Sequence, residues 1–216
     1  MGASFRFPLL LLGLWLAQNA PAQSVLVQPY VQPGDRSTLG GTDAMAVLWV
    51  TDQVPGDFTV EFGPTNGPLR SAKASRVQFD FAPPKPKAEP PPPTPPREAT
   101  KGPAANGGQH FFRYTAPLND LPFDSQVLYR VKLGARVVRE ASFATRASTG
   151  KTIRFVTVGD LASGQAAQNA VAYQISRVQP QFVVLLGDIV YPSGRVSQYM
   201  DHFWTTYNQP PDSLHA

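Results

Sequence analysis

The most regular hydrophobic feature of the chain is a run of five apolar residues at 182–186, which ends in Gly187-Asp188 and is followed by Tyr191. A short unbroken apolar run predicts a strand buried on both faces of a sheet. An unpaired carboxylate is costly inside such a strand, so we expect Asp188 at its carboxyl end. Open α/β sheets bind their ligands at that end. Asp188 and Tyr191 would offer oxygen atoms there, which hard cations prefer.

The same signal occurs once more upstream, where residues 153–158 predict a strand that ends in Gly159-Asp160. Between the two runs, residues 166–178 carry apolar side chains at roughly helical spacing and no proline. The apolar positions are Ala167, Ala170, Val171, Ile175 and Val178. Strand, helix and strand imply a right-handed crossover and a parallel pair. Asp160 and Asp188 would then lie at one edge of the sheet, where they repel each other unless a cation sits between them.

Upstream of this unit the pattern changes to short strands separated by clusters of Pro, Gly, Asn and Asp. The expected strands are 45–51, 58–63, 111–115, 127–133 and 141–145. Regular alternation with such turn signals is typical of a β sandwich, and we expect a fibronectin type III-like domain over residues 23–147. Trp49 is expected in its core.

One stretch interrupts the sandwich, because ten of the 21 residues from 83 to 103 are proline. Proline has no N–H to donate to a strand ladder. We therefore expect an extended polyproline loop inserted between two strands.

The amino-terminal residues 1–22 have the pattern of a signal peptide. Arg6 precedes a short apolar run at 9–16, and Ala20-Pro21-Ala22 gives an Ala-x-Ala cleavage signal. The run is short for a transmembrane helix, so we expect secretion or export to the periplasm and no stable membrane insertion. The alternative is an uncleaved anchor.

Composition narrows the possible chemistry. The 216 residues include no cysteine, which excludes disulfides and thiolate metal sites, and 42% of them are hydrophobic. The formal charge of +4 is not gathered into a Lys/Arg stripe, so we expect no nucleic-acid partner.

After Tyr191, residues 196–207 predict a helix whose aromatic side chains pack in a core, with His202 off the main stripe.

The two Gly-Asp motifs together resemble those of the calcineurin-like metallophosphoesterases. Tyr191, which follows the second motif, narrows the resemblance to one of their families, the purple acid phosphatases. The family pattern Gly-Asp-x-x-Tyr is met in full by Gly187-Asp188-Ile189-Val190-Tyr191. The pattern Gly-Asp-x-Gly is met only as Gly159-Asp160-Leu161-Ala162, without the last glycine. The resemblance extends upstream through the sandwich to about Val25.

This resemblance implies a binuclear centre of Fe³⁺ and a divalent ion, which is Fe²⁺, Zn²⁺ or Mn²⁺. By the family pattern Asp160 would bind the ferric ion, Asp188 would bridge both metals, and Tyr191 would bind the ferric ion as a phenolate. A metal pair can bind a phosphate ester, lower the pKa of a bound water and stabilise the leaving oxygen. The implied reaction is the hydrolysis of a phosphomonoester, as in an acid phosphatase.

The family's later blocks, Gly-Asn-His-Asp/Glu and Gly-His-x-His, do not occur in these 216 residues. The expected fold is thus a β sandwich followed by the first βαβα part of an α/β metallophosphoesterase domain. That part would occupy residues 152–216 and be incomplete, and the chain alone would be inactive. Two alternatives remain: a non-catalytic exported binding module built on the sandwich, and a small α/β fragment whose aspartates only cap strands.

Overall fold

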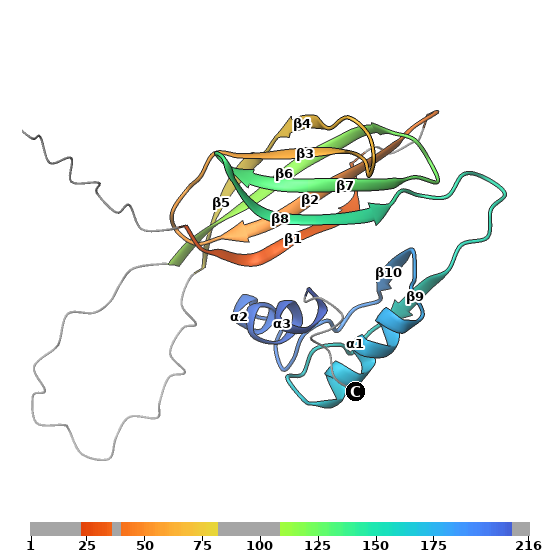
Figure 1. Ribbon diagram of the computed structural model, residues 1–216. Helices are drawn as coiled ribbons and strands as arrows, with labels where there is room; N and C mark the ends of the chain where they lie inside the picture. The colour runs from red at the N-terminus through yellow and green to blue at the C-terminus, as the bar shows by residue number, and fades with distance from the viewer. Residues whose placement is uncertain (1–22, 36–39, 82–108, 209–216) are drawn as a thin grey trace, which may run out of the picture.

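The computed structural model describes residues 23–35, 40–81 and 109–208. The predicted signal peptide (1–22) and proline-rich insertion (83–103) lie outside these residues. Most of the described chain is antiparallel β sheet, consistent with the predicted sandwich (Figure 1). No helix of these ranges is long and apolar enough to cross a membrane.

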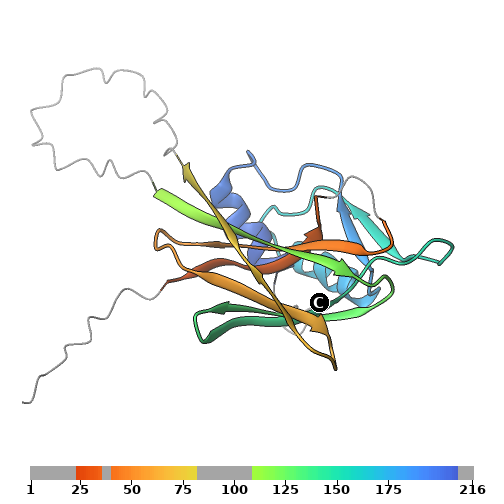
Figure 2. The same cartoon turned by 90° about the horizontal axis from the view of Figure 1, so that it is seen from above.

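Two four-stranded antiparallel sheets form the sandwich. One has the order β1-β2-β6-β5 and the other β4-β3-β7-β8, and Figure 2 shows them from above. The bounds are β1 Val25–Pro33, β2 Asp43–Thr51, β3 Phe58–Pro64, β4 Arg70–Lys73, β5 Ser75–Phe81, β6 Gln109–Leu121, β7 Gln126–Leu133 and β8 Arg136–Ala144. The five predicted strands are present, but β1, β4 and β5 were not expected. The assignment of this sandwich to the fibronectin type III-like domains stays a prediction.

The sandwich core is centred on three aromatic rings. Trp49 on β2 is fully buried and stacks on Tyr114 of β6, its cross-strand partner, with ring centroids 5.3 Å apart. Phe58 of the facing sheet meets both rings edge-on, at 5.2 and 4.7 Å. Such contacts stabilise a core beyond their buried area, and they confirm the predicted core position of Trp49.

A buried ion pair holds the chain where it leaves the sandwich. Asp43 is fully buried, and its carboxylate accepts hydrogen bonds from the backbone N–H and the Nε of Arg146, at 2.8 and 2.7 Å. Arg146 also donates to the carbonyl of Ala44 at 3.0 Å. A buried carboxylate needs such partners to offset its desolvation. The end of the sandwich just after β8 is therefore fixed to β2.

A small parallel unit follows, composed of β9 Phe155–Val158, α1 Ala167–Arg177 and β10 Phe182–Leu185. The strands pair in parallel, with Phe182 opposite Phe155 and Leu185 opposite Val158. The predicted strand–helix–strand unit is thus present. Its assignment to a metallophosphoesterase domain stays a prediction.

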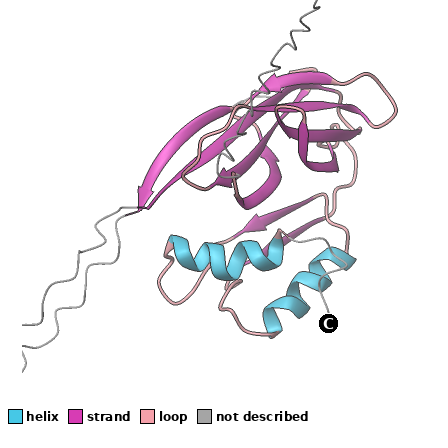
Figure 3. Cartoon of the chain, turned by 60° about the vertical axis from the view of Figure 1, so that its left-hand side comes forward, coloured by secondary structure: helices cyan, strands magenta, loops and turns pink. Residues whose placement is uncertain are grey.

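The predicted carboxy-terminal helix is also present, as one helical segment with a π turn inside it. Its parts are α2 Val196–Gln198, the π turn Tyr199–Phe203 and α3 Trp204–Tyr207. Figures 1 and 3 show it beside α1, beneath the sandwich. Trp204 packs against Tyr30 of β1 with centroids 4.8 Å apart, and Asn208 donates to the carbonyl of Gln28 at 2.6 Å. Strand β1 therefore contacts the second unit directly.

One burial prediction is wrong. The run at 182–186 was expected to be buried on both faces, but all its residues are exposed, from 38% at Val184 to 68% at Leu186. On α1 the apolar residues Val171 and Val178 are also more than 40% exposed, whereas Gln168 and Ala172 are buried. Within the described residues, two strands and two helical segments provide too few layers to cover both faces of this sheet.

Candidate metal centre

The carboxyl ends of β9 and β10 bring the two predicted carboxylates to one edge. The pairing continues past the strands, since the N–H of Leu186 donates to the carbonyl of Val158 at 2.9 Å. Asp160 follows two residues after the last pair of the ladder and Asp188 three residues after it, and both have positive φ, at 53° and 45°. Left-handed backbone is uncommon outside glycine, although aspartate tolerates it better than most residues. Two adjacent strands therefore end in the same unusual conformation, a kind of strain that often marks a functional site.

Glycines precede both aspartates, and they allow the strand ends to lie close together. A Cβ on Gly159 would come within 3.3 Å of the carbonyl oxygen of Gly187. Gly187 itself has φ 121°, a region that only glycine adopts readily.

The loops beyond the aspartates are joined by a second parallel contact. Ala162 and Val190 form an isolated bridge, in which the N–H of Ala162 donates to Ile189 and the N–H of Tyr191 donates to Ala162, both at 3.0 Å. Ala162 is fully buried here. The alanine that replaces the family's glycine is thus accommodated without positive φ, and its methyl group packs in a small core with Leu161, Val190 and Phe203.

This bridge places Tyr191 beside Asp160. The phenol donates a hydrogen bond to the Asp160 carboxylate. That bond, supported by the negative charges of Asp160 and Asp188, raises the pKa of Tyr191 to about 12. The three predicted ligands therefore converge, and the two carboxylates make the site negative.

The convergent atoms are all oxygens, which fit a hard cation such as ferric iron. A bound cation would take the place of the proton that the phenol shares with Asp160. In 23–35, 40–81 and 109–208 there is no cluster of three or more His, Cys, Asp or Glu side chains that could hold a metal. The donor set thus suits part of the shell of one ion and does not complete a binuclear centre.

A pocket of about 390 Å³ opens next to these oxygens, lined by residues 188–194 and Tyr199. Gln198 holds the turn that lines this pocket, since its Oε1 accepts hydrogen bonds from the N–H groups of Ser193 and Arg195 at 3.2 and 3.0 Å. The turn after Tyr191 is therefore fixed, and one side of the candidate site is open to a ligand.

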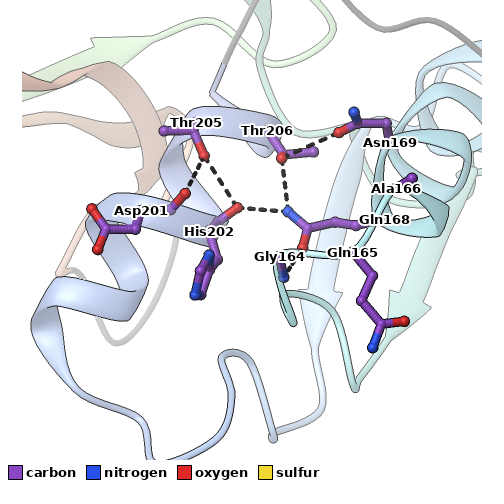
Figure 4. A pocket seen from close by; sticks show the side chains of 9 residues that line it. All are labelled: Gly164, Gln165, Ala166, Gln168, Asn169, Asp201, His202, Thr205 and Thr206. Carbon is purple, nitrogen blue, oxygen red and sulfur yellow. Dashed lines mark hydrogen bonds between the residues drawn. The ribbon is translucent and has the colours of Figure 1, made fainter.

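A second polar pocket of about 210 Å³ lies between the start of α1 and the π turn (Figure 4). His202, which lies off the main apolar stripe of its helix, is on the wall of this pocket. The sequence interpretation missed Gln168, a buried amide that also lines the pocket, because the apolar periodicity of α1 falls at other positions.

No protein-family model matches the chain, and no curated protein sequence matches it. Among solved structures, the chain is similar to purple acid phosphatase PPD1 from yellow lupin (Lupinus luteus) seeds, with a TM-score of 0.54 and 17% identity. The match covers 83% of this chain and 32% of the lupin protein. Astrotactin-2, a vertebrate-specific perforin-like membrane protein, matches over 70% of this chain and 24% of its own at 10% identity, but its TM-score of 0.30 carries no argument. The chain thus spans about a third of the length of the lupin phosphatase, and it shares a phosphatase-like fold with that protein.

Proposed function

We propose that this chain carries one metal-binding face of an exported purple acid phosphatase-type hydrolase, with Asp160, Asp188 and Tyr191 as oxygen ligands. The observation that carries the proposal is the convergence of these side chains at the carboxyl ends of the parallel strands β9 and β10, with Tyr191 hydrogen-bonded to Asp160. The phosphatase-like fold supports it independently.

Each residue has a role that its chemistry suits. The Asp188 carboxylate has two oxygens and would hold both ions, while Asp160 would hold the ferric ion and accepts the hydrogen bond of the Tyr191 phenol. A trivalent ion would lower the pKa of that phenol far below its present value of about 12 and make it a phenolate ligand. When bound, the Fe³⁺–divalent pair would supply the Lewis acidity and the activated water for cleaving a phosphomonoester. The open pocket beside Asp188 would admit the ester.

The described residues lack the nitrogen ligands that a second ion of this family requires, so we expect no appreciable phosphomonoesterase activity from the 216-residue chain alone. Ferric binding is the measurable property. Titration with Fe³⁺ should produce the visible tyrosinate-to-iron absorption band, and Tyr191→Phe should abolish it. Tyr199→Phe, which removes a phenol from the wall of the same pocket, is the matched control and should keep the band.

A chain that shows no band with Fe³⁺ would exclude this proposal. Turnover of a phosphomonoester by the purified chain, lost in Asp188→Ala, would instead show that the three oxygens suffice for catalysis.

The competing function is a non-catalytic exported binding module. It is favoured by the contrast between the sandwich, whose core is closed around Trp49, and the parallel unit, whose strands remain exposed. Such a module would not retain iron, so the same titration separates the two functions.

A further inference from the structure

Gln168 in the first turn of α1 is buried, although the apolar residues of the sequence pattern fall at other positions of this helix. Its side chain is 6% exposed, while the apolar Val171 on the same helix is 43% exposed. A primary amide has two N–H donors and an accepting oxygen, and burying it without partners is costly. A polar side chain at such a position therefore needs a reason.

The amide has a partner for each of its functions (Figure 4). Its Oε1 accepts the backbone N–H of Gly164 at 3.1 Å, and its Nε2 donates to the carbonyl of His202 at 2.6 Å and to the Oγ1 of Thr206 at 2.7 Å. Gly164 lies in the loop that begins at Asp160, whereas His202 and Thr206 belong to the helical segment that follows Tyr191. One side chain thus connects the chain segments of two candidate ligands.

The carbonyl of His202 that accepts this bond belongs to the π turn Tyr199–Phe203. The N–H of Trp204 reaches back five residues to Tyr199, as in a π helix. Such a turn shifts the regular ladder and is frequent at functional sites. The carbonyl of His202 accepts from the Gln168 amide of α1 at 2.6 Å and from the Thr205 hydroxyl of its own helical segment at 3.4 Å.

Glycine at position 164 allows the loop to approach this turn. Gly164 has φ 78°, and a Cβ there would come within 2.8 Å of the His202 Nδ1. The loop and the π turn are therefore in direct contact, and the Tyr207 hydroxyl adds a bond to the Leu161 carbonyl at 3.2 Å.

We infer that Gln168 is a positioning residue of the candidate metal centre, which holds the loop after Asp160 at a fixed distance from the helical segment that follows Tyr191. The inference rests on the proposed function, because it concerns the geometry of the same ligands. Replacing a residue that orients a metal ligand without touching the metal commonly lowers the metal affinity about 10- to 100-fold.

The test uses Gln168→Glu in the full chain, a substitution that keeps the shape and one accepting oxygen but removes both donors. Gln174→Glu, the same change at an exposed position of α1, is the control. We expect the ferric affinity of Gln168→Glu to fall about 10- to 100-fold and its tyrosinate band to shift, while the control matches the parent chain. Gln168→Met, an apolar side chain of similar length, should give the same result and avoids the added charge.

Amide hydrogen exchange tests the positioning of the two loops without any bound metal. In both Gln168 variants the N–H groups of Ala162 and Tyr191, which join the two loops, should exchange faster, with sandwich amides unchanged. Parental iron affinity, band and exchange in both variants would overturn the inference, and so would global unfolding of both, which would indicate a purely structural amide. If the parent chain binds no iron, the proposed function fails, and exchange at Ala162 and Tyr191 alone decides whether Gln168 positions the loops.

Discussion

Tyr191 holds its proton far more tightly than an ordinary tyrosine, with a pKa of about 12. The main cause is the hydrogen bond to Asp160, and the charges of both aspartates act in the same direction. A raised pKa means that the folded state favours the protonated phenol. Its contribution to stability is therefore present below pH 10 and is lost as the pH rises through about 12.

Removing the Asp160 carboxylate should lower the pKa of the Tyr191 phenol. In Asp160→Asn we expect the pKa of Tyr191 to move from about 12 towards 10, measured by ultraviolet titration with Tyr191→Phe as the reference. Asp201→Asn, which removes an exposed carboxylate from the π turn, should leave the titration unchanged. A Tyr191 that already ionises near pH 10 in the parent chain would contradict the contact with Asp160.

At the scale of the elements, a small apolar cluster supports the candidate site. Leu161, Ala162, Val190 and Phe203 are each at most 8% exposed, and they join the ends of both ligand loops to the π turn. Strand β9, helix α1 and strand β10 were all predicted within two residues of their ends, because continuous apolar runs and good helix formers are local signals. Strands β4 and β5 were missed because their residues are mostly polar and exposed. Their pairing partners, rather than their own sequence, make them strands.

Phe203→Ala should weaken this cluster more than the rest of the molecule. Truncating a buried phenylalanine costs roughly 3–5 kcal/mol, with the lower end expected where the site can collapse. Hydrogen exchange resolved by segment should accelerate in 153–207 and remain unchanged in the sandwich. Phe155→Ala, the same truncation at a residue that is 49% exposed, should have a smaller effect. Equal acceleration in both units would show that they unfold together.

At the scale of the whole molecule, the two units differ in how well they bury apolar side chains. Of the large hydrophobic side chains that are exposed in the described residues, most lie between 153 and 186; these are Ile153, Phe155, Val171, Val178, Phe182, Val183, Val184, Leu185 and Leu186. Exposed apolar side chains in such number, beside strand edges, make a molecule prone to association.

The chain should accordingly bind the dye ANS in its native state. Leu186→Lys, at the most exposed of these positions, should lower the dye fluorescence measurably. Val137→Lys is the control, since Val137 is 49% exposed on the sandwich strand β8, away from the parallel pair. A parent chain that does not increase ANS fluorescence would show that this surface is covered in solution.

The sequence alone determined the strands of the sandwich that alternate clearly, the strand–helix–strand unit and the three candidate ligands, because each is encoded by neighbouring residues. Gly-Asp after an apolar run marks a strand end whatever the rest of the chain does. Tertiary structure alone decided which faces are buried and what holds the loops, since burial depends on the layers that are present. It exposed Leu186 and Val171, and it buried Gln168 between Gly164 and His202. Periodicity reports that a face is apolar, but only packing decides what covers it.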